Sequence, residues 1–533
     1  IFSDEYVYAK MARSFFHEGN LLVHGLNLYS YPPLYPIVLS LTYVFKDMAL
    51  VFCSMKVLNA LLSSLIIIPA FLLAKEFLKE KEALLITGLI AMLPPMVAFS
   101  SYVMSENLFY PLFLCSFYFL YKSFTESKLH YNVLAVIFVS LTILTRLLGL
   151  ILVIIALGVI IIRLWGKDWR KVAVKTSAWG LFLLLLLWWI VSRLEGFVQA
   201  YTKIVTKTDF IVTHPVLIFG LWILMYIALI ALSSGVIFFV LNFTAIKERL
   251  KEKKLQTFWL MSLIGLVGMI VLVSYYNVHG VIKQVTLFDW FSGRPIGRYI
   301  DIILPLILIN GMIGLQYYKK KSKEFSKALW IVGIITMVSA QLMFFKLLPI
   351  NNMSLAWMGA IKYAFNKMFL NIPGLSNEFN VTYIIVFFVI AVGLFSIIHR
   401  IHNTKGLTLK GVAYFFAIFF LLVSTLNVSM NYYNVERFWA NNEQTELGVW
   451  INANIKEEAT FVFDQKDCTH FDFKRSTETI CHPKHHTTLM GFWINNKVVI
   501  GDTSDGEYFL SLHEYDLPIL RKTENEIYLY ATK

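Results

Sequence analysis

Long apolar blocks constrain this chain of 533 residues more than any other feature. They run for 16 to 30 residues and hold few charges. A helix rises 1.5 Å per residue, so about 20 such residues cross a bilayer core of about 30 Å. Only 15% of the residues are charged, against about 25% in soluble domains. A wholly soluble globule and a disordered chain are therefore excluded, and the sequence predicts a polytopic membrane protein.

We expect twelve spans, placed from hydropathy. They are 49–74, 83–100, 107–122, 131–145, 147–163, 174–192, 214–243, 256–276, 300–318, 327–348, 381–398 and 411–431. The stretch from Pro32 to Phe45 is apolar but short, and it opens with two prolines. It is predicted to be an interfacial helix along the outer leaflet. Since the first residues then lie outside, a further helix is expected upstream of Ile1.

The formal charge of +13 comes from six short loops, which hold 23 Lys and Arg and eight acids. These loops, at 75–82, 122–130, 163–175, 247–254, 319–327 and 399–410, have a net charge of +15, and the rest of the chain has −2. Short cytoplasmic loops collect Lys and Arg, so the basic residues indicate how the chain is oriented in the membrane. No basic patch is left over for a nucleic-acid partner. Residues 1–48 and the tail are placed on the extracytoplasmic side.

Three regions are predicted: a first outer loop with interfacial helices (1–48), a transmembrane domain (49–431) and a soluble α/β domain (432–533). In the tail, Glu443–Ile455 has helical spacing, and 460–463, 497–500, 508–512 and 526–530 are typical of strands. Cys468 and Cys481 lie in this outer domain. They are candidates for a disulfide, and the alternatives are a zinc site with the nearby histidines or two free thiols.

Asp4 and Glu5 are the first candidates for catalysis. Ser3 is a good N-cap, and Tyr8 and Phe15 belong to an apolar stripe at helical spacing. Acids also favour the first turn of a helix because of its dipole, by about 0.3–1 kcal/mol, so a purely structural role is open. Their position just outside the membrane favours a functional one.

Glu106 is the second candidate, because it is the only acid between residues 83 and 125. A carboxylate at the hydrocarbon edge is costly unless it is wet, paired or facing a cavity. The alternative is an interfacial cap for the span that begins at Asn107.

Four cations are predicted near the same depth: Lys56, Arg146, Arg294 and Arg298. Arginine grips phosphate through a planar fork of donors, although snorkelling to lipid phosphate is the simpler role for Arg146. Carboxylates and cations together suit a hydroxyl nucleophile that attacks a sugar linked to a lipid phosphate. The carboxylate takes the proton, and the cations stabilise the departing phosphate.

Asp4-Glu5-x-x-Tyr8, Tyr31-Pro32-Pro33-Leu34, Ser105-Glu106, Thr145-Arg146 and Arg298-Tyr299 resemble the polyprenyl-phosphate-sugar-dependent glycosyltransferases of the GT-C superfamily. The protein O-mannosyltransferase and aminoarabinose transferase group is the most similar, over about the first 165 residues. The resemblance implies about a dozen helices and a C-terminal outer domain. It makes Asp4 the essential first-loop acid, Glu5 its neighbour, Glu106 the second-loop acid and Arg146 the donor-phosphate ligand, with Tyr8, Tyr31 and Tyr299 as substrate-binding candidates.

Three departures from the resemblance matter. Tyr31 stands where the aminoarabinose enzymes carry a lysine before the two prolines, and Ser30 stands where a metal-binding carboxylate is found. Divalent-metal dependence is therefore left open. The Trp-Trp-Asp signature of oligosaccharyltransferases is missing because Ile190 follows Trp188-Trp189, which argues against en bloc transfer of an oligosaccharide.

The sequence thus predicts an α-helical polytopic GT-C-like glycosyltransferase with a small C-terminal α/β domain. It moves a hexose or pentose from a polyprenyl (dolichyl-type) monophosphate to a lipid, glycan or protein acceptor on the extracytoplasmic face, with inversion. A lipid-carrier or solute transporter is the alternative, but it predicts ionisable residues at the bilayer midplane, whereas most charges here lie at the interfaces. A receptor or scaffold leaves the first-loop acids unexplained.

Overall fold

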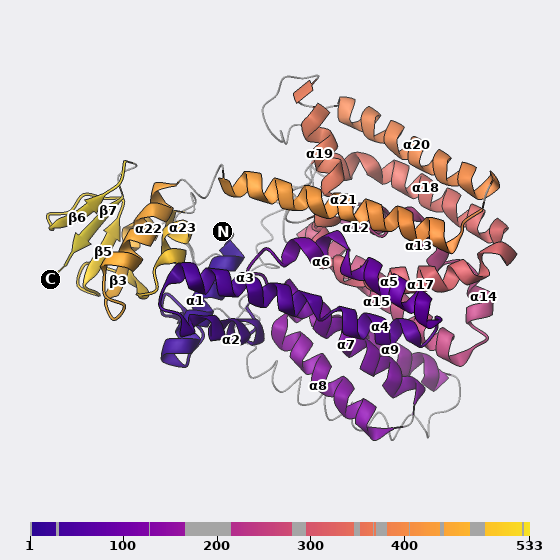
Figure 1. Cartoon of the computed structure of the whole chain (residues 1–533), viewed down its shortest axis with the longest axis horizontal. Coiled ribbons are helices and arrows are strands. Elements are labelled where there is room, and N and C mark those ends of the chain that lie inside the picture. Colours follow the sequence, from indigo (N-terminus) through magenta and orange to yellow (C-terminus); the bar gives the residue numbers. More distant parts are fainter. Residues whose placement is uncertain are drawn as a thin grey trace.

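The computed structural model has a helical bundle at one end and a small α/β domain at the other (Figure 1). It describes residues 3–27, 31–126, 128–165, 215–279, 295–345, 352–365, 367–368, 381–404, 406–436, 442–468, 486–524 and 527–532. Between the bundle and the α/β domain lie α1 (Ser3–Glu18), the hairpin β1 (Leu22–Val23) and β2 (Leu26–Asn27), and α2 (Leu34–Ser40).

The bundle follows the predicted spans closely wherever it is described. Its helices are α3 (Met48–Ser64), α4 (Ile67–Lys75), α5 (Glu80–Ala91), α6 (Pro94–Phe99), α7 (Glu106–Thr125), α8 (Leu129–Thr145), α9 (Ile151–Trp165), α12 (Pro215–Ser233), α13 (Val236–Asn242), α14 (Ile246–Arg249), α15 (Lys253–His279), α17 (Leu304–Tyr317), α18 (Ser322–Phe345), α19 (Ala356–Phe365), α20 (Val381–Thr404) and α21 (Leu409–Val435). The predicted span 174–192 lies outside the described residues. The helix predicted at 32–45 corresponds to α2 and η1 (Leu41–Val44), and its location at the membrane surface stays a prediction.

Three predicted spans are divided between two helices. In span 49–74 a turn at residues 65–66 separates α3 from α4. Span 83–100 breaks into α5 and α6 because Pro94 and Pro95 lack the N–H that a continuing helix needs. Span 214–243 breaks at Gly235, which has φ +66° and opens α13. A Cβ at Gly235 would lie 1.9 Å from the Phe416 ring, so this break lets α21 approach closely.

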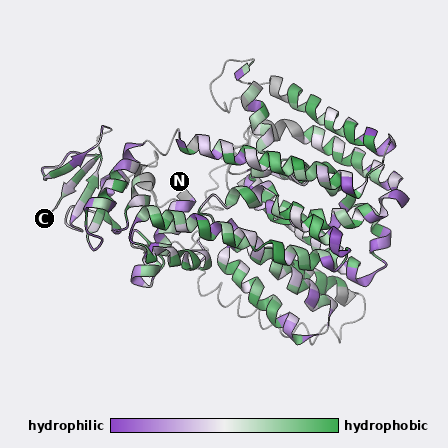
Figure 2. Cartoon of the chain, viewed as in Figure 1, coloured by the Kyte–Doolittle hydropathy of each residue, from purple (hydrophilic) through white to green (hydrophobic). Residues whose placement is uncertain are grey.

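Six described segments are long and apolar enough to cross a membrane: Met48–Lys75, Pro215–Ser233, Lys253–Val278, Asp301–Lys320, Ile385–Thr404 and Leu409–Tyr433. The predicted count of twelve stays a prediction. Figure 2 shows hydrophobic residues along the bundle helices and hydrophilic ones at the helix ends away from the α/β domain. Exposed apolar side chains such as Val389 (63%) and Leu422 (63%) cover α20 and α21, as expected for surfaces in contact with lipid.

The C-terminal domain is a five-stranded sheet in the order β4-β3-β5-β7-β6. Its elements are α22 (Glu443–Asn454), β3 (Thr460–Asp464), α23 (His486–Trp493), β4 (Lys497–Gly501), β5 (Tyr508–Ser511), β6 (Ile519–Lys522) and β7 (Tyr528–Ala531). Strand β3 pairs in parallel with β4 and β5, whereas β7 pairs antiparallel with β5 and β6. The predicted helix and four strands are confirmed, but β6 and α23 were not predicted. Strand β6 has only four residues, Ile519-Leu-Arg-Lys522, and lies mostly exposed, so it shows no alternation of apolar and polar residues.

Candidate active site

The first turn of α1 places Asp4 against the bundle. Its Oδ1 accepts a hydrogen bond from the Tyr31 hydroxyl (2.9 Å), and its Oδ2 lies 3.3 Å from Arg298 Nη1. The side chain keeps 27% exposure, so water or a substrate reaches it. Burial, together with Asp4, raises the pKa of the Tyr31 phenol well above its ordinary value. At neutral pH Tyr31 therefore donates to Asp4 as a neutral phenol.

Glu5, the next residue, is buried with 4% exposure. Its Oε1 accepts a hydrogen bond from the Val103 backbone N–H at 2.7 Å and lies 3.7 Å from Lys56 Nζ. Lys56 also donates to the Ser101 carbonyl and lies 4.5 Å from the centre of the Phe52 ring. Glu5 thus joins α1 to α3 and to the segment before α7, which suits support of the site better than proton transfer.

Glu106 and Arg146 form the most buried ion pair of this region. Glu106 is the first residue of α7, and Arg146 follows α8 in an extended conformation. Because α7 and α8 are consecutive helices packed side by side, the start of one and the end of the other meet at the same end of the bundle. Arg146 Nη1 contacts Glu106 Oε1, and Glu106 is only 1% exposed. A buried carboxylate needs such a partner.

Aromatic rings connect the two arginine pairs. The Arg146 and Arg298 guanidinium carbons lie 5.4 and 5.5 Å from the centre of the Tyr299 ring, within the usual cation–π range. On the acid side, the Tyr8 hydroxyl donates to Ser105 Oγ at 2.9 Å, and Ser105 Oγ lies 3.5 Å from Glu106 Oε2. The Tyr8 and Tyr31 rings meet edge to face with centres 5.3 Å apart.

We name the six side chains Asp4, Glu5, Lys56, Glu106, Arg146 and Arg298 the charge cluster. The structure thus brings three predicted acids and three predicted cations into three ion pairs, Asp4–Arg298, Glu106–Arg146 and Glu5–Lys56, of which Tyr299 links the first two. Tyr8, Tyr31 and Tyr299 lie among them as the aromatic linkers described above. Each arginine already has a carboxylate partner. An anionic ligand at the cluster therefore has to share or displace that partner.

Two contributors were not predicted. Ser105 bridges Tyr8 to Glu106; the sequence marked it only as part of the Ser105-Glu106 motif and gave it no role of its own. Asp301 is 1% exposed and is the first residue of η4 (Asp301–Ile303), two residues after Tyr299. Its Oδ1 accepts a hydrogen bond from the Ser354 hydroxyl at 3.0 Å, whereas its Oδ2 has no hydrogen-bond partner within the described residues. An isolated acid at the start of an apolar run was the available signal for Asp301.

Some predicted residues cannot be placed. Arg294 and Cys481 lie outside the described residues, as does the side chain of Cys468, so the disulfide and the zinc site stay predictions. Cys53 and Cys115 are free thiols. The described residues contain no group of three His, Cys, Asp or Glu side chains suited to a metal ion.

Comparison with solved structures identifies the fold. The crystal structure of ArnT from Cupriavidus metallidurans in the apo state aligns with a TM-score of 0.56 and 13% identity, over 99% of this chain and 93% of that one. The chain has a GT-C fold. The crystal structure of the same ArnT bound to undecaprenyl phosphate aligns with a TM-score of 0.55 and 13% identity, over 99% of this chain and 93% of that one. An oligosaccharyltransferase from Archaeoglobus fulgidus in the apo form aligns with a TM-score of 0.41 and 10% identity, over 94% and 61%.

A family model described as dolichyl-phosphate-mannose-protein mannosyltransferase matches residues 19–203. This segment includes Lys56, Glu106 and Arg146 and begins after α1. No curated protein matches the chain. The chain thus shares the fold of ArnT, contains one segment that matches the mannosyltransferase model, and has six described helices long and apolar enough to span a membrane.

Proposed function

We propose that the chain transfers a single hexose or pentose from a polyprenyl-monophosphate donor to an acceptor hydroxyl on the extracytoplasmic face, with inversion at the anomeric carbon. The observation that supports this most is the charge cluster. A partly exposed carboxylate, Asp4, lies 3.3 Å from one of two guanidinium groups that share the Tyr299 ring. A base beside phosphate-binding cations is what this reaction needs.

In the proposed step the acceptor hydroxyl attacks the anomeric carbon from the face opposite the phosphate. The new bond joins the acceptor oxygen to that carbon, and the bond between the carbon and the phosphate oxygen breaks. The hydroxyl proton goes to Asp4, and the electron pair leaves with the polyprenyl phosphate. Arg298 and Arg146 stabilise the charge that grows on the departing phosphate. Removing a contribution of this kind typically costs about 10²–10⁴-fold in rate.

Arg298 is well suited to receive the phosphate. Its Nη1 contacts Asp4, while its Nε has no hydrogen-bond partner among the described residues. A phosphate oxygen at Nε would leave the Asp4 contact in place, and so the base and the leaving group would share one guanidinium. Arg146 contributes from the other side of Tyr299, whereas Lys56 is paired with Glu5 and supports the position of α1.

The supporting residues have separate tasks in this proposal. Tyr31 holds the Asp4 carboxylate by donating to Oδ1, while Arg298 Nη1 donates to Oδ2. Each carboxylate oxygen has a second lone pair, and one of these takes the acceptor proton. Tyr8 and Ser105 orient Glu106, which in turn fixes Arg146. Tyr299 sets the spacing of the two guanidinium groups. Residues 1–48 and 432–533 form the extracytoplasmic parts, and 49–431 the transmembrane domain.

A lipid-linked donor agrees with the ArnT structure bound to undecaprenyl phosphate and with the mannosyltransferase family match. The acceptor belongs to the lipid, glycan or protein class. The exposed apolar faces of η1, including Leu41 and Val44 (69% and 65% exposed), fit a helix lying in the membrane surface beside α1. A donor carried by lipid would reach the charge cluster from that surface.

The test incubates the purified full chain with radiolabelled polyprenyl-phosphate sugars and a membrane extract. Native protein should transfer label to an extractable product, and Asp4→Asn should not. Glu514→Gln, an exposed acid of the C-terminal domain, is the matched control and should transfer as native protein does. If the native chain transfers no sugar from any donor, the function is refuted. If Asp4→Asn transfers equally well, Asp4 is not the base.

A further inference from the structure

The face of α1 opposite the charge cluster packs against the C-terminal domain. Lys10 Nζ donates to the Ile494 carbonyl at 2.5 Å, and Arg13 Nε donates to the Asn495 carbonyl. Tyr6 belongs to the same face, since a Cβ on Gly491 would lie 2.6 Å from its hydroxyl oxygen. Residues 6, 10 and 13 are spaced as one side of a helix, so α1 presents one face to the charge cluster and another to this domain.

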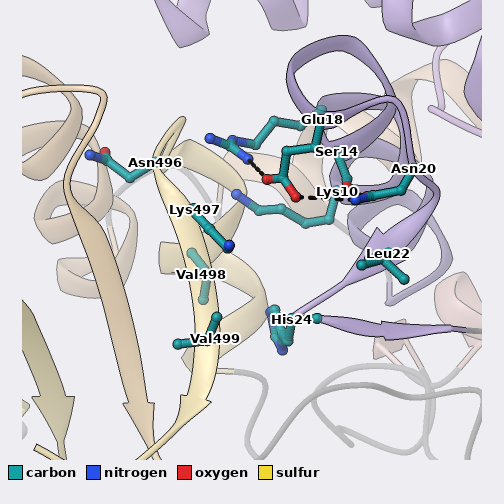
Figure 3. Close-up of a pocket in the computed structure, with 12 residues that line it drawn as sticks. Lys10, Ser14, Glu18, Asn20, Leu22, His24, Asn496, Lys497, Val498 and Val499 are labelled. Carbon is teal, nitrogen blue, oxygen red and sulfur yellow. Dashed lines mark hydrogen bonds and ion pairs between the residues drawn. The ribbon is translucent and has the colours of Figure 1, made fainter. Parts of the chain in front are cut away.

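A pocket of about 230 Å³ lies between α1, the β1–β2 hairpin and β4. We name it the interdomain pocket; Lys10, Arg13, Glu18, His24 and Lys497 line it. A cavity needs only about 10–15 Å³ to hold one water, so this volume admits a polyatomic ion. Figure 3 shows the Lys10 and Lys497 side chains directed into the space between α1 and β4, with Glu18 on the α1 side.

The charges of the interdomain pocket are unbalanced. Three cations line it, and Glu18 is the only acid among the lining residues. Glu18 is already paired with Arg13 at 3.2 Å. Lys10 is only 5% exposed and has no carboxylate partner within the described part of the chain. Lysines are rarely this buried unless they are paired, so Lys10 lacks the counter-charge expected for its burial.

His24 supplies a further donor. It occupies the β1–β2 turn with φ 52°, is 7% exposed and shares a 2.6 Å hydrogen bond between its Nε2 and the Tyr6 hydroxyl. Burial, together with Lys10, lowers the pKa of His24 to about 3, so the ring is neutral at pH 7. When Tyr6 donates to Nε2, the ring proton is on Nδ1, which has no partner in the described structure.

We propose that the interdomain pocket binds an oxyanion of the acceptor, a phosphate or a carboxylate that does not itself react. Lys10 and Lys497 hold its charge, and the His24 ring donates to it. Asp4 and Lys10 are six residues apart on α1, which corresponds to about 9 Å along the helix. Because these two residues lie on opposite faces of α1, an extended acceptor that passes around the helix would place a hydroxyl near Asp4 while its anionic group occupies the pocket. This inference rests on the proposed function.

The first test measures binding of inorganic phosphate, and separately of acetate, to the detergent-purified full chain by calorimetry. Losing a charged hydrogen bond weakens binding by about tenfold or more. We expect that loss in Lys10→Met and in Lys497→Met, whereas Lys456→Met, an exposed lysine of the same domain, keeps native affinity. Lys497 is exposed, so its variant should fold even where Lys10→Met does not. Stronger binding of phosphate or of acetate identifies the class of anion.

Proton uptake gives an independent readout. Burial and the neighbouring Arg13 lower the pKa of Lys10 well below its ordinary value, and a bound anion raises it again. Phosphate binding at alkaline pH should therefore take up a proton in native protein and not in Lys10→Met, as measured in buffers of different ionisation enthalpy. Affinity unchanged in both lysine variants would overturn the proposal. So would binding that is lost in Arg146→Met alone, since the phosphate would then occupy the charge cluster.

The second test concerns the acceptor. In the sugar-transfer assay Lys497→Met should raise the acceptor KM about tenfold or more, with kcat and the donor KM unchanged. An unchanged acceptor KM would overturn the acceptor role. If native protein transfers no sugar, the proposed function is refuted, and the phosphate measurements still decide whether the pocket is an oxyanion site.

Discussion

The Glu106–Arg146 pair gives the sharpest test of how the charge cluster is built. Arg146→Met leaves Glu106, which is 1% exposed, without its cation, and its nearest described polar contact is then Ser105 Oγ at 3.5 Å. Breaking a buried ion pair by removing one partner costs about 3–5 kcal/mol. Because Arg146 keeps 17% exposure, we expect a loss near the lower limit, about 3 kcal/mol.

The double variant Arg146→Met/Glu106→Gln separates stability from catalysis. Neutralising Glu106 removes the uncompensated charge, so most of the lost stability should return, whereas sugar transfer should stay abolished because the phosphate ligand is gone. Lys128→Met is the matched control: Lys128 is 61% exposed and lies 3.4 Å from Glu126, and an exposed pair contributes at most about 1 kcal/mol.

The measurement is the free energy of unfolding in detergent micelles, obtained by titration with a denaturing detergent. It is made on native protein, both single variants, the double variant and Lys128→Met. The coupling between Glu106 and Arg146 should exceed 2 kcal/mol in size, within the range seen for residues in contact. If the free energy of unfolding of Arg146→Met lies within about 1 kcal/mol of the native value, Glu106 is not buried beside Arg146, and the described geometry is wrong.

Three further predictions follow from other parts of the structure. Asp4→Asn should lower sugar transfer by about 10²–10⁴-fold. Its melting temperature should fall less than that of Arg146→Met, since Asn still accepts from Tyr31 and the Asp4–Arg298 pair is the more exposed of the two. A drop as large as that of Arg146→Met would assign Asp4 a structural role. The pKa of His24 is lowered to about 3, so folding stability should fall as pH falls below 6.5, by about 2 kcal/mol between pH 6.5 and 5. His24→Gln should lack this pH-dependent loss in thermal unfolding. A pH profile identical to that of native protein would contradict the prediction. In a background without other cysteines, Lys456→Cys should react with an impermeant thiol reagent from outside the cell and Lys323→Cys only after permeabilisation, and the reverse pattern would place the charge cluster on the cytoplasmic face.

Hydropathy predicted the bundle well because a membrane leaves few solutions for apolar blocks of this length. It missed the breaks at Pro94 and Gly235, since both segments stay apolar throughout. At Gly235 the break depends on the close approach of Phe416, a contact between residues far apart in the sequence that hydropathy does not encode.

The candidate site was predicted in its residue types more than in its pairings. Isolated charges such as Glu106 and Arg146 stand out in apolar surroundings, so both could be identified. The pairing of Asp4 with Arg298 joins residues 294 positions apart, and only the fold brings them together. The interdomain pocket was not predicted because Lys10 looks like an ordinary surface lysine until the C-terminal domain packs over it.

The most direct test of the central claim is a cryo-electron-microscopy structure of the chain in a lipid nanodisc with a bound polyprenyl phosphate. The account predicts that the phosphate lies within hydrogen-bonding distance of Arg298 and Arg146, on either side of the Tyr299 ring, with Asp4 facing the position of the sugar. A phosphate bound elsewhere, with both arginines still closed on their carboxylates, would contradict it.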